Sequence, residues 1–421
     1  MLTKENNELI TRTNRGTAGG NLLRQYWQPV ALSVELKEDP VPVRIMGEDL
    51  VLFRDSSGKP ALVERFCPHR GTDMSYGRVE NDGIRCIYHG WCFNSKGQCT
   101  EQPAEPAGKS FENKIRITAY PCTEAGGLIL TYMGDGEPPL LPAYSWFQAP
   151  LDQIHVGKVF HYCNYWQGVE GEIDPSHLSY VHAYEELGED SNFDGAKYYT
   201  SYVTPTIEAE ETDYGIRIHT KRVINEEQIY YRATNFVYPC FGVVGGVLPT
   251  SLLVNWHVPI DDEHHWKYSI HYKQSGPMTE AERKQLDNNY IGELTPDYKP
   301  IRTKENRYLQ NREIMKTWSY SGIGDTPGSG IVAQDLVATE SQGPIQDRTK
   351  EHLGYGDIAI AMSRRLMLKA MKDMQEGGTA PHVIRTPEQN HVDHVLIVSE
   401  IIQNDENWKE YWRRKVKEPK L

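Results

Sequence analysis

Two short segments, each pairing a cysteine with a histidine, constrain this chain more than any other feature of its 421-residue sequence. The first contains Cys67 and His69, the second contains Cys86 and His89, and 16 residues lie between them. Each segment therefore presents one thiolate and one imidazole from a short loop. Two iron ions can share such a set, because one iron takes both sulfurs and the other takes both ring nitrogens. Glycines that suit loops turning their N–H groups toward bridging sulfides lie close by: Gly71, Gly83 and Gly90.

Zinc is the alternative ligand for two cysteines and two histidines. Zinc sites usually space cysteine with cysteine and histidine with histidine, whereas each loop here mixes the two types. The pattern therefore predicts a Rieske-type 2Fe–2S cluster, in which two neutral imidazoles raise the reduction potential above that of an all-cysteine cluster. The remaining cysteines lack such partners and are interpreted as small buried residues: Cys92, Cys99, Cys122, Cys163 and Cys240.

The residues around these loops alternate between apolar and polar in short stretches. Residues 41–65 read as strands separated by turns, residues 128–132 form a further apolar stretch, and a Pro- and Gly-rich link follows at 134–142. These signals divide the chain into three parts: an N-terminal segment at 1–24 that packs on the larger domain, a small all-β Rieske domain at 25–140, and the larger domain at 141–421.

The larger domain combines strands and helices. Residues 214–272 contain long alternating segments that predict an antiparallel sheet. Thr279 and Glu282 form a capping box that opens one helix, and Asp357 can cap another that ends near Gly377. Helices packed on one antiparallel sheet give the α+β class. The apolar residues of the second helix follow a helical period: Ile358, Met362, Leu366 and Met367.

Charge and hydropathy exclude several classes of partner and location. The formal net charge of −13 argues against a nucleic-acid or anionic-membrane surface. No apolar run approaches the roughly 18–20 residues of a membrane span, and the polar segment from Met1 to Asn14 does not resemble a signal peptide. Seven cysteines suit a reducing compartment, so a cytoplasmic location is expected.

A second set of potential metal ligands lies in the larger domain. Asp174 precedes His177 by three residues, and His182 follows five residues later. Two histidines and a carboxylate are what non-haem Fe(II) needs to keep positions open for dioxygen. Histidines five apart lie about 140° apart on a regular helix, so they converge only at a π-turn or a helix end. Two surface histidines would be the alternative interpretation, but the cluster motif upstream favours a mononuclear iron site.

Together these motifs resemble one family, the oxygenase α-subunits of Rieske non-haem iron aromatic-ring hydroxylases. The Asp-x2-His-x4-His motif of that family matches Asp174, His177 and His182. Within it, the chain is most similar to the phthalate 4,5-dioxygenase branch, which includes O-demethylases. The resemblance covers nearly the whole chain, and its further cues are three segments: 88–91, 167–171 and 334–354.

The resemblance implies that Asp335 is the third iron ligand. The residues alone leave alternatives, because Glu340 and Asp347 also follow the Gly-rich segment 322–330 and are also acidic. The resemblance further implies that Asp174 bridges a cluster histidine of one subunit to an iron histidine of the next, within a homotrimer. Many relatives have Asn where this chain has Glu170, which suggests a role for Glu170 beside the iron ligands or in proton transfer.

The family also implies partners. An NADH-dependent reductase, with a flavin and a plant-type ferredoxin domain or a separate ferredoxin, must deliver electrons, because the chain has no Gly-x-Gly-x-x-Gly fingerprint. No cysteine follows His69 closely, which resembles the disulfide-free, low-potential cluster class. The expected enzyme uses dioxygen to hydroxylate or cis-dihydroxylate a small aromatic substrate. O- or N-demethylation is the alternative reaction, and a Rieske electron carrier or a zinc-binding interaction protein is the alternative of another class.

Substrate contacts are expected from the sheet of the larger domain. Arg217, Arg222 or Arg232 could hold a carboxylate or sulfonate, although each alone also fits an outward-facing charge. The aromatic residues expected to line the pocket are Tyr198, Tyr199, Tyr230, Tyr231, Phe236 and Trp256.

Overall fold

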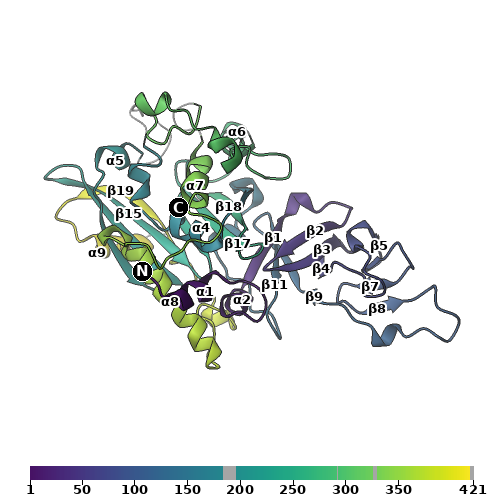
Figure 1. The fold of residues 1–421 in the computed structure, drawn as a ribbon. Coiled ribbons are helices and arrows are strands. Elements are labelled where there is room, and N and C mark those ends of the chain that lie inside the picture. The colour runs from purple at the N-terminus through teal and green to yellow at the C-terminus, as the bar shows by residue number, and fades with distance from the viewer. Residues whose placement is uncertain (184–195, 292, 326–329, 418–421) are drawn as a thin grey trace.

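The computed structural model describes residues 1–183, 196–291, 293–325 and 330–417. A small β-rich domain extends to one side of a larger domain that is built on a broad sheet (Figure 1). The predicted α+β class, with an all-β Rieske domain and a helix-covered antiparallel sheet, is confirmed. No described helix combines the length and the apolar character needed to span a membrane.

The described strands of the small domain form short antiparallel sheets. The core next to the cluster loops includes Val51, Phe53, Val63, Trp91 and Phe93. The strands are β1 (Trp27–Leu32), β2 (Val41–Ile45), β3 (Glu48–Arg54), β4 (Pro60–Glu64), β5 (Arg78–Glu80), β6 (Gly83–Arg85), β7 (Cys92–Asn94), β8 (Cys99–Glu101), β9 (Ala119–Tyr120), β10 (Cys122–Ala125) and β11 (Leu128–Tyr132). Their orders are β1-β11-β10, β2-β3-β4-β9 and β5-β6-β7-β8.

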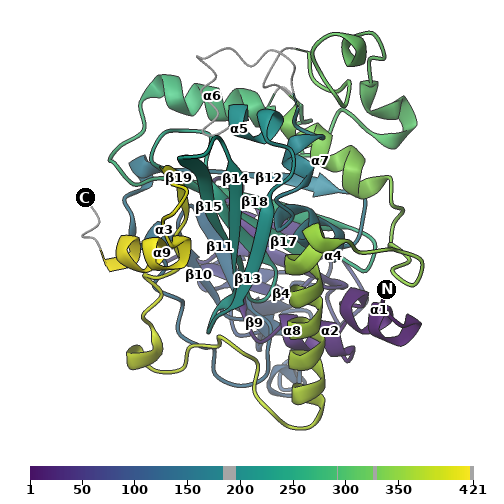
Figure 2. The ribbon, with the colours of Figure 1, turned by 90° about the vertical axis from the view of Figure 1, so that its left-hand side faces the viewer.

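One antiparallel sheet organises the larger domain, with the order β12-β18-β17-β16-β15-β14-β13 and β19 paired to β15 (Figure 2). Its strands are β12 (Ile154–His161), β13 (Thr206–Glu211), β14 (Gly215–Val223), β15 (Gln228–Val237), β16 (Phe241–Gly245), β17 (Ser251–Pro259), β18 (His265–Lys273) and β19 (Val398–Gln403).

Helices cover the sheet of the larger domain and connect its parts. The α-helices are α1 (Lys4–Thr11), α2 (Ala18–Leu23), α3 (Ser145–Gln148), α4 (Tyr165–Glu172), α5 (Ala196–Ser201), α6 (Glu280–Ile291), α7 (Ile331–Glu340), α8 (Ile358–Gln375) and α9 (Trp408–Lys417). The 3-10 helices are η1 (Ser33–Glu35), η2 (Met74–Tyr76), η3 (Glu112–Lys114), η4 (Leu151–Gln153), η5 (His177–Ser179), η6 (Lys304–Leu309), η7 (Ile314–Lys316), η8 (Tyr355–Asp357) and η9 (Pro387–Gln389).

The two faces of the sheet bury different helices. Ile229 and Tyr231 of β15 pack with Trp412 of α9. Because side chains alternate along a strand, Ile216 and Ile218 of β14 share the opposite face, where they join the core that includes α4 and α8. The N-terminal helices α1 and α2 lie against α8. Helices therefore bury residues on both faces of the sheet, α9 on one face and α4 with α8 on the other.

Two predicted helix starts have different outcomes. Thr279 and Glu282 form the expected capping box at α6, with the Thr279 N–H donating to the Glu282 carboxylate at 2.7 Å and the Glu282 N–H donating to the Thr279 hydroxyl at 3.2 Å. Asp357 does precede α8, but its carboxylate accepts the Gly354 N–H at 2.6 Å and makes no capping bond to the helix. Asp357 therefore closes the turn before α8, and the prediction that it caps the helix is wrong.

Candidate metal centres and adjoining cavity

The two loops with the Cys–His pairs close in the same way. Cys67 lies after β4 and Cys86 lies between β6 and β7, and both side chains are buried. The Gly71 N–H donates to the Cys67 carbonyl at 2.8 Å, and the Gly90 N–H donates to the Cys86 carbonyl at 3.1 Å. Both glycines have a φ of +75°, a conformation that other residues rarely adopt. Matching turns therefore bring one thiol and one imidazole from each loop to the same place.

The imidazoles fit a metal group between the loops. The rings of His69 and His89 lie 4.4 Å apart, and His69 stacks on Trp91. Among the described residues, the buried Nδ1 of His69 has no hydrogen-bond partner, which a bound iron would provide. Burial raises the pKa of the Cys67 thiol to about 11, so a metal charge is needed to stabilise its thiolate. These residues fit a Rieske 2Fe–2S cluster.

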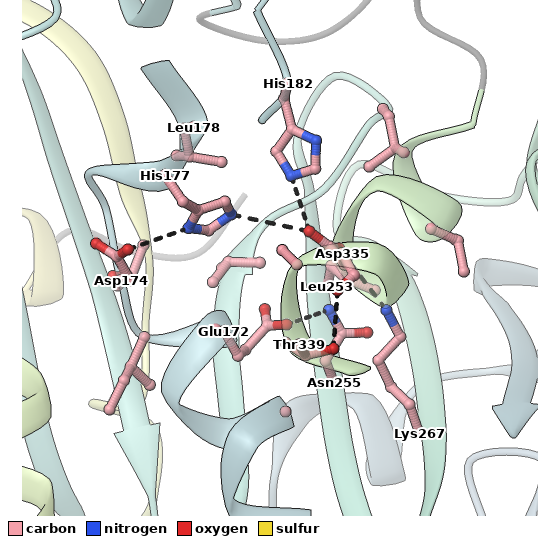
Figure 3. A pocket seen from close by; sticks show the side chains of 18 of the residues that line it. Glu172, Asp174, His177, Leu178, His182, Leu253, Asn255, Lys267, Asp335 and Thr339 are labelled. Carbon is pink, nitrogen blue, oxygen red and sulfur yellow. Dashed lines mark hydrogen bonds and ion pairs between the residues drawn. The ribbon is translucent and has the colours of Figure 1, made fainter. Parts of the chain in front are cut away.

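The second group of ligands comes from two separate parts of the larger domain. Past the end of α4, η5 begins at His177 and the following turn carries His182, while Asp335 projects from α7 (Figure 3). The Asp335 Oδ1 lies 3.0 Å from the His182 Nε2 and 4.0 Å from the His177 Nε2. One ligand atom from each of the three lies within 4.8 Å of the others, as one metal ion requires. The two histidines converge at a short 3-10 turn beyond the helix end.

Neighbouring side chains orient these ligands. The buried Gln334 contacts the His182 Nδ1 through its amide oxygen at 2.7 Å, and its amide nitrogen donates to the Ile323 carbonyl at 2.9 Å. Asp174 accepts the Ser176 N–H and lies 3.7 Å from the His177 Nδ1. The Gln334 contact holds the ring orientation of His182 and raises its basicity as a ligand, whereas the His177 Nδ1 has no hydrogen-bond partner among the described residues. Gln334 was not predicted as a site residue. Its position directly before Asp335 in the sequence is the feature that could have indicated it.

The electrostatics suit a cation. Burial alone would raise the pKa of Asp335, but His182, Lys267 and His177 hold it well below its usual range. Asp335 is therefore a carboxylate at neutral pH. The donor set of two imidazoles and one carboxylate, with a cavity beside it, matches the chemistry of non-haem Fe(II). These three residues fit the mononuclear iron.

A cavity of about 280 Å³ adjoins the three ligands. Its wall includes Arg232 and several apolar side chains, and its polar end is formed by His161, His257 and Lys267. Lys267 lies beside Asp335 (Figure 3). Glu172 also lines the cavity and accepts a hydrogen bond from the Asn255 amide at 2.8 Å. Burial raises the pKa of Glu172. The apolar side chains are Leu178, Val244, Val247, Leu253, Ile331 and Val332.

Of the predicted substrate contacts, Arg232 is the one that the structure places among the described lining residues of this cavity. Arg217 pairs with Glu210 on the opposite sheet face, and Arg222 donates to the Pro175 carbonyl beneath the metal loop. The predicted aromatic lining is not observed among the described residues of the wall. Tyr198 is partly buried and stacks on Tyr230, and the other five rings are buried outside this wall: Tyr199, Tyr230, Tyr231, Phe236 and Trp256.

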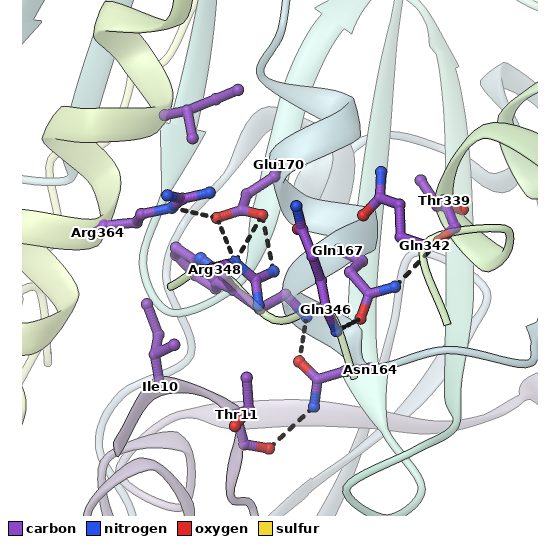
Figure 4. A network of polar contacts seen from close by, with 12 residues as sticks. Ile10, Thr11, Asn164, Gln167, Glu170, Thr339, Gln342, Gln346, Arg348 and Arg364 are labelled. Atoms are coloured by element: carbon purple, nitrogen blue, oxygen red, sulfur yellow. Dashed lines mark hydrogen bonds and ion pairs between the residues drawn. The ribbon is translucent and has the colours of Figure 1, made fainter. Parts of the chain in front are cut away.

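Glu170 lies away from this cavity, in a buried network of charges (Figure 4). Its carboxylate accepts hydrogen bonds from Arg348 at 2.7 Å and from Arg364 at 2.5 Å. Arg364 also binds Glu351. Burial would raise the pKa of Glu170, but the two arginines lower it, so the carboxylate stays charged. The network fixes α4 against α8 and against the segment after α7. Glu170 therefore lies in this network, and not beside the iron ligands as the sequence suggested.

Gly168 allows α4 to approach the sheet. A Cβ at this position would lie 2.2 Å from the His257 Nδ1 and 2.7 Å from the His265 Nε2. We expect Gly168→Ala to destabilise the protein by about 1–3 kcal/mol through overpacking, measured as the change in the free energy of urea unfolding. Gly171→Ala is the matched control on the same helix, because its Cβ would lie 3.3 Å from a Thr339 methyl group. Equal stability of the two variants would contradict this packing argument.

A cluster domain joined to a helix-covered sheet that carries two histidines and an aspartate defines a class of protein, the iron oxygenases supplied with electrons by a Rieske centre. Residues 26–121 match the Rieske [2Fe-2S] domain, and residues 131–420 match the family described as LigXa C-terminal domain like. The chain belongs to the oxygenase subunits of multicomponent Rieske non-haem iron oxygenases.

Individual relatives support this assignment. The chain is 34% identical to the phthalate 4,5-dioxygenase oxygenase subunit of Pseudomonas putida, over 99% of this chain and 96% of the relative. It is 35% identical to the 5,5'-dehydrodivanillate O-demethylase oxygenase subunit of Sphingobium sp., over 93% and 85%. Its fold is similar to the oxygenase in a reduced oxygenase–ferredoxin complex of carbazole 1,9a-dioxygenase, with a TM-score of 0.60 and 20% identity over 90% of this chain and 99% of that one.

Proposed function

We propose that this oxygenase oxidises a small aromatic compound that carries one anionic group. The observation that carries this proposal is that Arg232 and several apolar side chains line the same cavity as His177, His182 and Asp335. Apolar walls bind a ring face, and a guanidinium binds a carboxylate or sulfonate through two parallel hydrogen bonds. When bound, the mononuclear iron supplies dioxygen activation, with electrons drawn through the cluster.

This chain's own residues then orient the reaction. Leu178, Leu253 and Ile331 exclude water around the ring, and Arg232 fixes which end of the ring faces the ligands. Ring hydroxylation and O-demethylation differ only in which carbon lies nearest the iron. The relatives named above include both a ring dioxygenase and an O-demethylase, and ring hydroxylation is the first reaction to test. Reconstitution with a reductase, NADH and a panel of aromatic acids and methoxylated acids, followed by product analysis, tests the proposal.

Arg232→Gln is expected to raise KM for an anionic aromatic substrate by about 10- to 100-fold, since a hydrogen bond to a charged group is worth about 1.5–3 kcal/mol. KM for the neutral amide of the same compound should change little. Arg232→Lys keeps the charge but loses the planar fork, so an intermediate KM is expected. Steady-state kinetics on the acid and its amide measure both effects, and an equal loss for the two compounds would contradict an anion-binding role.

We further infer that electrons come from an NADH-dependent reductase and that the chain works as a homotrimer in the cytoplasm. The cluster loops lie in the small domain, and α4 and α7 lie in the larger one (Figure 1). Phe66, Ile87 and Tyr88 expose apolar surface around the cluster loops, which suits contact with another protein. The proposed bridge by Asp174 would place the neighbouring subunit there. Sedimentation of the wild type tests the homotrimer, and a slower rate of cluster reoxidation by dioxygen and substrate in Asp174→Asn is expected if Asp174 bridges the subunits. Reduction of the cluster by a reductase and NADH, followed by its absorption, tests the electron donor.

A further inference from the structure

The polar end of the cavity is built from three neighbouring strands. His161 of β12, His257 of β17 and Lys267 of β18 all line it, and each is more than nine-tenths buried. His257 and Lys267 are directly opposite each other in the ladder between β17 and β18, so their side chains leave the same face of the sheet side by side. This end therefore combines imidazoles and an ammonium group, all of them on buried side chains.

The protonation of His257 follows from its contacts. The His265 Nδ1 lies 2.8 Å from the Cys163 carbonyl, which can only accept, so this nitrogen carries the proton. Burial lowers the pKa of His265 to about 3, which leaves its Nε2 as an acceptor. The His257 Nδ1 lies 3.0 Å from that Nε2 and must donate to it. Burial also holds the pKa of His257 far below its usual value, so the His257 Nε2 presents a lone pair.

That lone pair has no hydrogen-bond partner among the described residues, and neither ring nitrogen of His161 has one. Lys267 lies 4.0 Å from the nearer oxygen of Asp335, which is beyond hydrogen-bond distance. A buried polar atom without a partner costs about 1–3 kcal/mol, and native proteins rarely retain several of them together. The polar end is therefore suited to receive a polar group from outside the protein.

Two other roles fit the geometry less well. His161, Cys163 and His265 lie close enough to hold a metal ion, but both nitrogens of His265 already have hydrogen-bond partners. A proton relay through His257 and His265 would end at the Cys163 carbonyl, which cannot pass a proton onward. His265 instead holds His257 so that the His257 Nε2 can only accept a hydrogen bond.

We propose that His257 and Lys267 together recognise a hydroxyl group on the substrate, an inference that rests on the proposed function. The hydroxyl would donate its proton to the His257 Nε2, while its oxygen accepts a hydrogen bond from Lys267. A carboxylate has no proton to donate and would face the lone pair of His257. Water can occupy the same position, and a substrate hydroxyl replaces it without loss of hydrogen bonds.

The position of His257 and Lys267 would also orient the aromatic ring of the substrate. Lys267 is beside Asp335, so a hydroxyl bound there places the attached ring next to the iron ligands. Arg232 lies on β15, three strands away from β18 in the sheet. Two separate parts of the cavity wall would therefore bind different groups of the substrate: Arg232 would bind an anion, and His257 with Lys267 would bind a hydroxyl.

The test measures binding to the iron-loaded oxygenase by calorimetry, without a reductase. The probes are ortho-, meta- and para-hydroxybenzoate, each compared with the corresponding methylbenzoate, which has a similar shape but no hydrogen bond. For at least one isomer we expect the wild type to bind the hydroxy acid about tenfold or more tightly. His257→Leu should remove this preference while binding of the methyl acid is kept, and His257→Asn, whose amide oxygen can accept, should restore part of it.

His271→Leu is the matched control, because His271 lines the same cavity but is opposite Leu253 in the ladder and not opposite Lys267. It should keep the preference. The cluster absorption and the iron content show whether each variant is folded. A wild type that prefers no hydroxy acid, or a preference that survives in His257→Leu, would overturn the inference. Failure of the proposed function is recognised separately, as absence of NADH-dependent products from every aromatic acid despite hydroxyl-selective binding.

Discussion

Asp335→Ala is expected to lose the mononuclear iron and to reduce turnover by about a thousandfold or more, because removing one member of a catalytic unit disables the whole. His177 and His182 would remain, but two imidazoles without the carboxylate bind Fe(II) weakly. The cluster lies in the other domain and should be unaffected. Iron analysis should show the loss of one iron per chain, while the electron paramagnetic resonance signal of the reduced cluster is unchanged.

Asp347→Ala is the matched control for this variant. Asp347 follows the same Gly-rich segment, but its carboxylate accepts from the Thr349 hydroxyl and pairs with Lys350 at the surface. It should retain the iron content and turnover of the wild type. Full iron content in Asp335→Ala, or loss of iron in Asp347→Ala, would show that the third ligand is assigned to the wrong carboxylate.

Glu170→Gln is expected to destabilise the protein by about 3–5 kcal/mol, since it leaves the buried guanidinium of Arg348 without its carboxylate. Arg364 would keep Glu351 as a partner, so the loss centres on Arg348. The free energy of unfolding in urea, measured on the cluster-containing protein at neutral pH, gives the effect. Because α4 leads into the loop with His177, weaker iron binding should accompany it.

The effect of Glu170 has a defined pH dependence. The pKa of Glu170 is lower in the folded protein than in the unfolded chain. The carboxylate therefore contributes its full stabilisation at pH values above the pKa of the unfolded chain, and this contribution is lost as the pH falls through the pKa of the folded protein. The difference between wild type and Glu170→Gln should therefore be constant at neutral pH and shrink below about pH 4.

Glu211→Gln provides the comparison for Glu170→Gln. Glu211 pairs with Arg365, the residue next to Arg364 in α8, but both side chains are more than half exposed. An exposed pair contributes less than about 1 kcal/mol. Equal destabilisation by the two substitutions would show that burial of the network is not what makes Glu170 matter.

The candidate metal ligands that lie close together in the sequence could be proposed from it. Cys67 with His69 and Cys86 with His89 are local pairs whose chemistry is specific, and each pair needs only one tight turn to present its ligands. His177 and His182 are also local. The sequence left a π-turn or a helix end as the way for them to converge, and the structure has α4 ending at Glu172 before η5 begins at His177. Short spacing limits the possible geometries, so residue type and spacing carry most of the information.

Contacts between distant segments were not predictable in this way. Asp335 came from a family resemblance, because Glu340 and Asp347 satisfy the same local criteria. Glu340 instead accepts the Tyr162 N–H and the Tyr308 hydroxyl within the core. Glu170 has two arginine partners that lie 178 and 194 residues further along the chain. Which helices cover each face of the sheet depends on packing across the whole domain, so strand alternation alone could not distinguish Arg232 from Arg217.

The long reach of the Glu170 network has a consequence for the order in which the protein can be completed during synthesis. The small domain is closed by pairing of β1 with β11, so every residue around the cluster has been made once Tyr132 leaves the ribosome. The iron site needs Asp335 and the network that fixes α4 needs Arg364. Because domains generally fold as units during translation, we expect the cluster residues to come together while the chain is still being made, whereas the proposed iron site cannot assemble before Asp335 and Arg364 have been added.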